Sequence, residues 1–436
     1  MAELEAGGEL SGGCRKESSV SGWVCRCDAD GCDALPKSQL KPNIVNLFTS
    51  SHHAGPFHTS SLPWKPAANQ SPSSEGEMWI DVSQTRQEIL GFGGAFTDAA
   101  GMNIHRLPAA LQRQLLLSYF SPRGGAGYSI GRVPMASCDF STHEYSYDDV
   151  PDSTAEGSKS PGSVNAAIRQ SMVRAWLDEK QRKDGRPGGP YYKAWANYFL
   201  KFLDAYAQQN LSMWAVTVEN EPTAGLMPSY DFQAMGVGLH WYYDSFTPAI
   251  LLDAAHAAFP DVFYLSTEAC NGAILPGQRG VDLGSWKRGE MYAADVIENM
   301  NHWVGGWVDW NLALNDSGGP NWVNNNVDAP IIVPTTTTNQ PDRFYKQPMF
   351  YALAHFSAFI PPGSRWVSHK LMVESNVRGA AFVTPNAERV VVLLNRETEN
   401  EVKIRLSEMN RKSNILVNLP PASITTLHWQ KPKNPY

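Results

Sequence analysis

The chain has 436 residues, of which 42% are hydrophobic and 18% charged, and its net charge at pH 7 is −7. A disordered chain would have fewer apolar and more charged residues, so these values indicate a folded protein with a sizeable core. Lys and Arg are scattered, which excludes the basic footprint of a nucleic-acid-binding protein. No apolar run approaches the length of about 18 residues that crosses a bilayer. The length accommodates a catalytic domain of about 250 residues and a smaller partner domain.

The N-terminal segment, residues 1–36, predicts a small disulfide-bonded unit. Four of the six cysteines crowd into it, at Cys14, Cys25, Cys27 and Cys32. In a secreted protein such crowding indicates disulfides; a zinc site is the alternative, weakened by the lack of a C-x-x-C pair. Residues 1–13 have no apolar core, so the chain as written carries no secretory signal. Sequons compatible with secretion occur at Asn69, Asn210 and Asn315.

Both ends of the chain predict β-structure. Apolar and polar residues alternate at 78–82, as a half-buried strand requires. Three further strands are predicted near the C-terminus, at residues 389–394, 402–406 and 424–429. We therefore expect one β-sandwich, built from residues 37–88 and 365–436.

The middle of the chain, residues 89–364, alternates between strands and helices. Strands are predicted at residues 89–94, 128–136, 214–218 and 262–266. Helical spacing of apolar residues occurs at 107–120, 195–206 and 249–258. This alternation favours an α/β fold, with a (β/α)8 barrel as the first choice and a doubly wound sheet as the second. No phosphate-binding glycine motif follows a strand, so we expect neither a nucleotide cofactor nor a metal.

Two glutamates stand where a parallel barrel carries catalytic groups. The predicted strand at 214–218 runs into Glu221, and the next predicted strand ends in Glu268. Side chains at the carboxyl ends of barrel strands point into the active site, so both glutamates should face the same rim. A single glutamate at a strand end is more often a helix cap or an ion-pair partner. Two of them among aromatic residues favour catalysis.

Glycoside hydrolysis requires such a pair. A protonated carboxyl gives a proton to the leaving oxygen, and an ionised carboxylate about 5 Å away attacks the anomeric carbon with net retention. Asn220 stands beside Glu221, where it can hydrogen-bond the sugar 2-hydroxyl and help to separate the two pKa values. Aromatic residues at 240–242 and 307–310 offer flat apolar faces to a pyranose ring.

Six segments resemble animal glucosylceramidases, which belong to glycoside hydrolase family 30. They occur in family order, at residues 91–98, 132–140, 218–222, 266–270, 309–315 and 318–323. The resemblance extends from Cys14 nearly to the C-terminus. It implies a (β/α)8 barrel, a β-sandwich from both chain ends, and a disulfide-bearing N-terminal sheet. The disulfide pairs that it implies are Cys14 with Cys25 and Cys27 with Cys32.

The resemblance also implies roles for individual residues. Glu221 matches the family's acid/base, Glu268 its nucleophile, and Arg132 a buried arginine that supports both. Residues that match the groups holding the glucose hydroxyls are Asp139, Asn220, Trp310 and Asn325. Those that match the pocket wall are Phe140 and Tyr242. The remaining cysteines, Cys138 and Cys270, match unpaired, buried thiols without a catalytic role.

The activity implied by the resemblance is hydrolysis of the β-glucosidic bond of glucosylceramide at acidic pH. The implied location is the lysosomal lumen at the membrane, reached by the secretory pathway. The implied partners are a saposin-type activator, a lysosomal sorting receptor and an anionic membrane surface. Protonation of all 11 histidines would change the net charge from −7 to +4, which favours anionic lipid; ordinary surface histidines are the alternative.

The family pattern breaks twice. Three β/α units of about 30 residues should separate the two glutamates, yet Glu221 and Glu268 are 47 positions apart. The break falls at 235–236, and a second lies between Tyr147 and Tyr191, where a strand and a Trp-bearing loop are expected. The barrel should therefore lack two inner strands. An inactive member that only binds glycolipid or a receptor is consequently an alternative, and a different β-glycosidase such as a xylanase is another.

Overall fold

The computed structural model describes residues 10, 12–67, 76–147, 190–217, 236–243, 248–272, 279–335 and 341–431. The chain divides into two compact units. The larger comprises Met1–Val133 and Asp231–Tyr436, and the smaller comprises Pro134–Tyr230. No helix among the residues described is long and apolar enough to cross a membrane.

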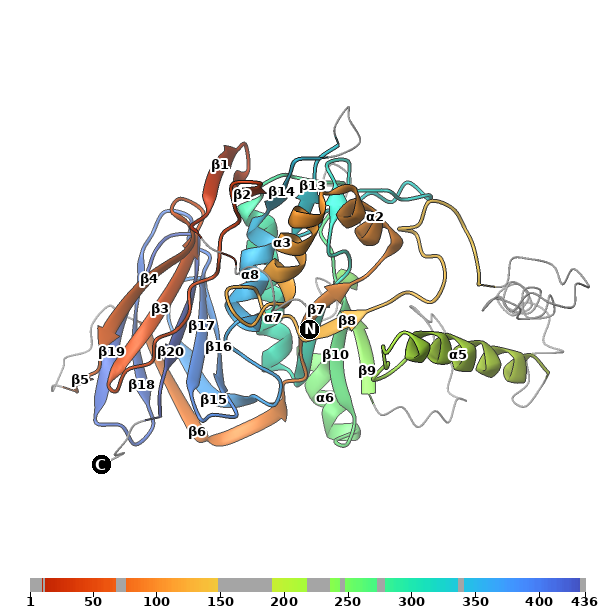
Figure 1. Ribbon diagram of the computed structural model, residues 1–436. Coiled ribbons are helices and arrows are strands. Elements are labelled where there is room, and N and C mark those ends of the chain that lie inside the picture. The colour runs from red at the N-terminus through yellow and green to blue at the C-terminus, as the bar shows by residue number, and fades with distance from the viewer. Residues whose placement is uncertain are drawn as a thin grey trace, which may run out of the picture. The chain divides into compact units, whose positions relative to one another are not determined.

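A parallel sheet of five strands carries the candidate site in the larger unit (Figure 1). Its strands are β7 (Gly91–Ala95), β8 (Ile130–Arg132), β9 (Gly236–His240), β10 (Phe263–Glu268) and β11 (Val304–Asp309). They lie in the order β8-β7-β11-β10-β9, so the first strand pairs with both the second and the last. That order is the seam at which a (β/α)8 barrel closes. Gly93 allows β7 to approach β8, since a Cβ there would lie 1.8 Å from the Ile130 carbonyl oxygen.

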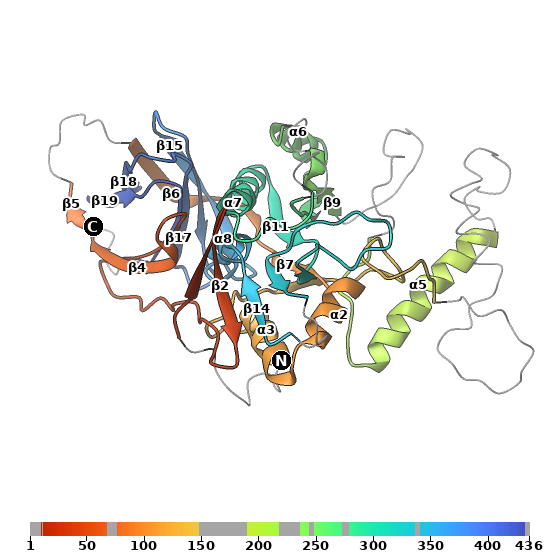
Figure 2. The same ribbon diagram turned by 90° about the horizontal axis from the view of Figure 1, so that it is seen from above.

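Two of the helices described in the larger unit form where the apolar spacing predicted them. The predicted helices at 107–120 and 249–258 are α3 (Ala109–Phe120) and α6 (Ile250–Ala258). The others are α2 (Asp98–Arg106), α7 (Trp286–Asn301) and α8 (Pro348–Ser357). Both α7 and α8 lie between the parallel sheet and the sandwich (Figure 2), where α7 contacts β11 and α8 contacts β7.

Two predicted strands were wrong in extent or in kind. The strand expected at 128–136 covers only Ile130–Arg132. Residues 214–217, in the smaller unit, form no strand, and Trp214 and Val216 are 67% and 43% exposed. An apolar run becomes a barrel strand only where neighbouring strands take its hydrogen bonds and bury its side chains. No strand in the described part of the chain pairs with 214–217, and the parallel sheet is an arc that ends at β8 and β9.

The prediction that both chain ends build one sandwich is confirmed. Ten strands form a hydrogen-bonded sheet in the order β4-β3-β20-β17-β16-β15-β6-β18-β19-β5. Its N-terminal strands are β3 (Ile44–Ser51), β4 (Gly55–Pro63), β5 (Lys65–Pro66) and β6 (Gly76–Glu88). Its C-terminal strands are β15 (Arg365–Met372), β16 (Val377–Val383), β17 (Arg389–Asn395), β18 (Val402–Glu408), β19 (Ser413–Leu419) and β20 (Ser423–Trp429). Their apolar side chains, among them Met78, Val391 and Trp429, bury a common core.

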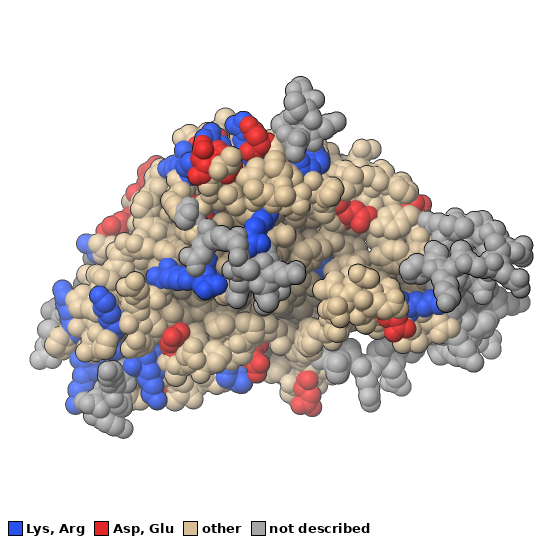
Figure 3. Space-filling view, in the orientation of Figure 1, with Lys and Arg blue, Asp and Glu red and all other residues tan. Residues whose placement is uncertain are grey.

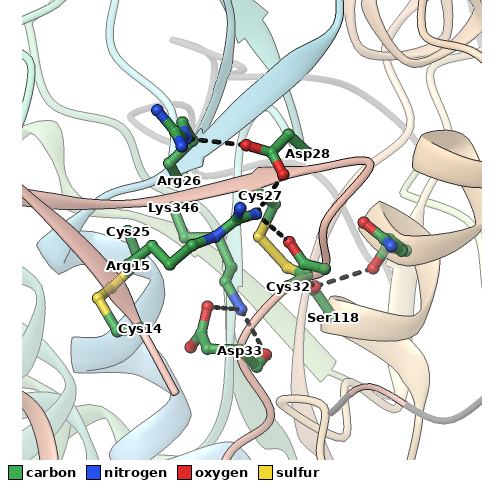
Figure 4. The surroundings of a disulfide bond; sticks show 12 residues. Cys14, Arg15, Cys25, Arg26, Cys27, Asp28, Cys32, Asp33, Ser118 and Lys346 are labelled. Carbon is green, nitrogen blue, oxygen red and sulfur yellow. Dashed lines mark hydrogen bonds and ion pairs between the residues drawn. A yellow bond between two sulfur atoms is a disulfide. The ribbon is translucent and has the colours of Figure 1, made fainter. Parts of the chain in front are cut away.

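A third sheet holds the N-terminal cysteines (Figure 4). It runs β1-β2-β14-β13-β12, with strands β1 (Arg15–Ser19), β2 (Gly22–Asp28), β12 (Leu314–Asn315), β13 (Ile331–Val333) and β14 (Arg343–Lys346). The implied disulfides are confirmed as Cys14–Cys25 and Cys27–Cys32. Of the residues described, Cys27, Cys32 and Asp33 form the one group close enough to share a metal, and its sulfurs are already bonded to each other. The zinc alternative is therefore wrong.

The other two cysteines, Cys138 and Cys270, are not disulfide-bonded, as expected. Cys270 is buried, but Cys138 is only partly buried, which corrects the expectation that both are.

The smaller unit contains the predicted aromatic helix. It is α5 (Pro190–Gln208), a helix of 19 residues. Tyr198 and Phe202 are buried on one side of it, and the Tyr147 ring stacks on both. The 3.6-residue period thus set the packed face of this helix.

Candidate active site

Glu268 is the last residue of β10, and it is buried with 6% exposed. Its Oε2 accepts a hydrogen bond from Arg132 Nη1, and its Oε1 accepts one from the Tyr242 hydroxyl at 2.9 Å. His240 Nε2 lies 3.8 Å from Oε2, because the parallel register of β9 and β10 sets His240 opposite Glu268. Both carboxylate oxygens therefore face donor groups.

Arg132 reaches Glu268 across the inside of the arc. It ends β8, and two strands, β7 and β11, separate β8 from β10. The guanidinium also donates to the Thr267 carbonyl at 3.3 Å and lies 4.8 Å from the centre of the Trp310 ring. Only a curved sheet brings the carboxyl ends of β8 and β10 within reach of one side chain.

Tyr242 lies in the 3-10 turn Trp241–Tyr243 that follows β9. Burial raises the pKa of Tyr242 far above its usual range, and the neighbouring Cys270 and Glu268 raise that pKa further. The phenol consequently stays protonated and serves as a neutral donor to the carboxylate. The Trp241 indole donates to the Cys270 carbonyl at 3.0 Å, which fixes the turn against the residues after β10.

A second buried carboxyl lies at the end of the neighbouring strand. Asp309 ends β11, and its Oδ1 accepts hydrogen bonds from the Tyr292 hydroxyl and the Trp310 backbone, both at 2.8 Å. Burial raises the pKa of Asp309 well above its usual range. The Trp310 backbone also lies 2.8 Å from the Ala269 carbonyl, to which it donates. The single backbone N–H of Trp310 is thus shared between Asp309 and Ala269, and Trp310 is buried, with 7% exposed.

The remaining predicted site residues are not all joined to this group. Asn325 is exposed on the loop after β12, where its backbone donates to Asn321 Oδ1 at 3.0 Å. In the smaller unit, Asp139 Oδ1 accepts from the backbone of buried Phe140 at 3.1 Å. Asn220 and Glu221 lie outside the described residues. The structure therefore brings together Glu268, Arg132, Tyr242 and Trp310, and the separation of the two glutamates stays a prediction.

Three residues of this site had no individual role in the sequence interpretation. His240 counted only as one of the aromatic residues at 240–242, Cys270 as an uninvolved thiol, and Asp309 as a member of the segments 307–310 and 309–315. The signal that could have found His240 and Asp309 is their position, since each ends a strand of the same parallel sheet. Nothing in the sequence showed that Cys270 would contact Tyr242, at 3.2 Å between sulfur and oxygen.

Two family models match the chain. The family 30 TIM-barrel domain of the glycosyl hydrolases matches residues 89–156, 174–238 and 234–360, and the family 30 beta sandwich domain matches residues 363–427. This chain belongs to glycoside hydrolase family 30. The barrel match breaks between 156 and 174 and overlaps itself at 234–238. Both places lie where the sequence predicted missing segments.

Similar proteins agree with that assignment. Putative glucosylceramidase 3 of Caenorhabditis elegans is 34% identical over 493 aligned positions, which cover 94% of this chain and 93% of that protein. The lysosomal acid glucosylceramidase of Mus musculus is 34% identical, covering 95% of each. The nematode alignment has 57 more positions than the chain has residues. At least 57 of its positions are therefore residues of the nematode protein that have no counterpart in this chain.

Solved structures show the same fold. SrfJ from Salmonella typhimurium superimposes with a TM-score of 0.72 at 23% identity, covering 89% of this chain and all of that one. The endo-β1,6-glucanase BT3312 gives a TM-score of 0.68 at 19% identity, with the same coverage. At these identities the likeness concerns the fold alone.

Proposed function

We propose that this family 30 glycoside hydrolase is a retaining β-glucosidase that cleaves glucosylceramide to glucose and ceramide. The observation that carries the proposal is the buried Glu268 carboxylate at the end of β10, with Arg132 on one oxygen and Tyr242 on the other. A strand-end carboxylate whose two oxygens are held by fixed donors suits a nucleophile, since it is kept in one orientation for attack. The nematode and mouse glucosylceramidases supply the substrate class.

In the first step of the proposed mechanism, Glu268 attacks the anomeric carbon and forms a glycosyl-enzyme. Glu221 protonates the departing oxygen and then, as a base, activates the water that releases glucose. Fixed donors around Glu268 keep the attacking carboxylate in place without reorganisation during the reaction. Four residues are proposed to bind the glucose hydroxyls, namely Asp139, Asn220, Trp310 and Asn325, and two to form the pocket wall, Phe140 and Tyr242.

The proposed setting is the lysosome, in line with the name of the mouse relative. The substrate is lipid-borne, so we propose peripheral contact with an anionic membrane, assisted by a saposin-type activator after delivery by a sorting receptor. Lys and Arg side chains gather at the lower left of Figure 3, where Figure 1 places β18 and β19 of the sandwich. Such a surface attracts anionic lipid.

We assign residues 1–36 to the disulfide segment, 89–364 to catalysis, and 37–88 with 365–436 to the sandwich.

A second candidate function follows from the open arc of strands. A catalytic pair must be held to within about half an ångström by its supporting shell. With at least 57 aligned residues missing, the chain is on this second reading a catalytically impaired member that binds glycolipid without cleaving it.

Covalent trapping distinguishes the two. A 2-fluoro-glucoside with a dinitrophenyl leaving group needs no acid catalyst, so it reports on the nucleophile alone. The proposal expects a glycosyl adduct on the peptide that contains Glu268, lost in Glu268→Gln and kept in Glu221→Gln. Glu399→Gln, on an exposed loop, is the matched control and should label like the unaltered chain. Binding to glucosylceramide vesicles without any adduct would instead establish the second candidate, and an adduct on another residue would refute the assignment of Glu268.

A further inference from the structure

The thiol of Cys270 belongs to the surroundings of Glu268, although the mechanism above does not use it. Cys270 follows β10 by two residues and is buried, with 3% exposed. Its sulfur lies 3.2 Å from the Tyr242 hydroxyl oxygen, and that hydroxyl lies 2.9 Å from Glu268 Oε1. The three groups therefore form a continuous chain from thiol to phenol to carboxylate.

The direction of this chain follows from the donors available. A phenol has one proton to donate, and a carboxylate is a much stronger acceptor than a thiol. The Tyr242 proton consequently goes to Glu268. The Tyr242 oxygen retains lone pairs, and the Cys270 S–H is a weak donor that can bond to one of them.

We propose that Cys270 is a positioning residue for the nucleophile and acts through Tyr242. Its S–H holds the phenol rotor with the hydroxyl proton aimed at Glu268 Oε1. This inference rests on the proposed role of Glu268 and adds a residue that touches neither substrate nor reacting atoms. The backbone of Cys270 is itself held in place, because its carbonyl accepts a hydrogen bond from the Trp241 indole N–H at 3.0 Å.

One consequence separates this role from simple packing. Without the thiol, the phenol can rotate, so Glu268 loses a fixed donor and the trapping rate falls, but only while Tyr242 carries the hydroxyl that the thiol holds. A defect in packing alone would act in the same way whether or not that hydroxyl is present.

The first test is a double-mutant cycle on the trapping rate, normalised to folded protein. Cys270→Ala should slow trapping by about threefold to tenfold, the range that one neutral hydrogen bond supports. Cys270→Ser keeps a donor and should recover most of that loss. In a Tyr242→Phe background, Cys270→Ala should change the rate by less than about twofold, because the group through which it acts is gone. Equal effects of Cys270→Ala in both backgrounds would overturn the inference.

The second test does not depend on turnover. In protein with ¹³Cζ-labelled tyrosine, the signal of Tyr242 is the one that Tyr242→Phe removes. It should move in Cys270→Ala, return in Cys270→Ser, and stay in place in Cys138→Ala, which removes the other thiol that is not in a disulfide. A Tyr242 signal unchanged by Cys270→Ala would refute the positioning role. Failure of the unaltered chain to form an adduct, with the signal shift present, would count against the proposed function and leave the contact from Cys270 to Tyr242 established.

Discussion

The Lys346 ammonium and the Asp33 carboxylate form a buried ion pair at 2.6 Å, with side chains 1% and 5% exposed (Figure 4). Lys346 also donates to the Asp33 carbonyl at 2.9 Å, and the Tyr351 hydroxyl donates to Asp33 Oδ2 at 2.9 Å. Asp33 directly follows the disulfide Cys27–Cys32, while Lys346 ends β14 and Tyr351 lies on α8. The pair thus ties the N-terminal segment to β14, and Tyr351 adds a contact from α8.

Breaking this pair from one side should be costly, because the other charge is left buried and unpaired. We expect Lys346→Met to lower the free energy of unfolding by about 3–5 kcal/mol, measured by urea denaturation. Adding Asp33→Asn should recover part of that loss. Arg343→Ala, which removes an exposed ion pair with Asp342, is the control and should cost under about 1 kcal/mol. Equal losses in Lys346→Met and Arg343→Ala would show that the buried ion pair contributes no more to stability than the exposed one.

His355 should make the fold sensitive to acid. Burial lowers the pKa of His355 from 6.5 to about 3, and its ring nitrogens lie 2.8 Å from Thr426 Oγ1 and 2.7 Å from Ser50 Oγ. Between those pH values the unfolded chain binds the proton and the folded chain does not. Protonation of His355 therefore leaves the free energy of unfolding at its full value above pH 6.5. As the pH drops from 6.5 toward 3, that free energy falls by about 1.4 kcal/mol per pH unit.

Replacing His355 should weaken this pH dependence. We expect the loss of unfolding free energy between pH 7 and pH 4.5 to shrink by about 2–3 kcal/mol in His355→Gln. Part of the dependence should remain, since burial also lowers the pKa of His369 and of His428. His105→Gln, at an exposed position, should leave the dependence as it is. A curve for His355→Gln parallel to that of the unaltered chain would contradict this account.

Thiol chemistry should separate the cysteines into three classes. Without reductant, alkylation of the native chain should modify Cys138 first, because it is only partly buried, and Cys270 only on unfolding. After reduction all six cysteines should react. Peptide mapping should find Cys14 linked to Cys25 and Cys27 linked to Cys32. Reaction of any of these four before reduction would mean that the disulfides do not form.

Arg132 should be needed for trapping in a way that charge alone cannot replace. Arg132→Met removes the ion pair with Glu268 and the contact over Trp310, and we expect a fall in trapping rate of 100-fold or more. Arg132→Lys restores the charge but not the planar fork, so recovery should be partial. Full activity in Arg132→Lys would mean that only the charge matters.

The missing barrel segments should limit this chain as a whole. Open strand edges are aggregation sites, and displacement of a catalytic group by about 1 Å costs about 100-fold in rate. We expect the chain, expressed through a secretory pathway, to be retained in the cell or to aggregate. Its soluble fraction should hydrolyse a fluorogenic β-glucoside far more slowly than a variant with both segments restored, measured side by side at acidic pH. Comparable turnover per folded molecule would show that the gaps do not matter for catalysis.

The sequence alone determined the parts that rest on local pattern. The apolar periods at 249–258 and 402–406 set α6 and β18. The resemblance of six segments indicated the family, and the spacing between those segments indicated both gaps. These features are readable because a 3.6- or 2-residue period depends only on which side of the element is buried. The same logic was wrong at 214–217, since a strand needs partners that no local pattern records.

Only the tertiary structure decided how the surroundings of Glu268 are assembled. Arg132, Tyr242 and Glu268 come from three strands or turns far apart in the sequence, and the curvature of the sheet brings them together. The buried pair of Asp33 and Lys346 spans 313 positions and has no signature in either segment. Contacts of this kind arise because folding brings distant segments together and removes water from the polar groups between them, and each such group must then find its partner in three dimensions.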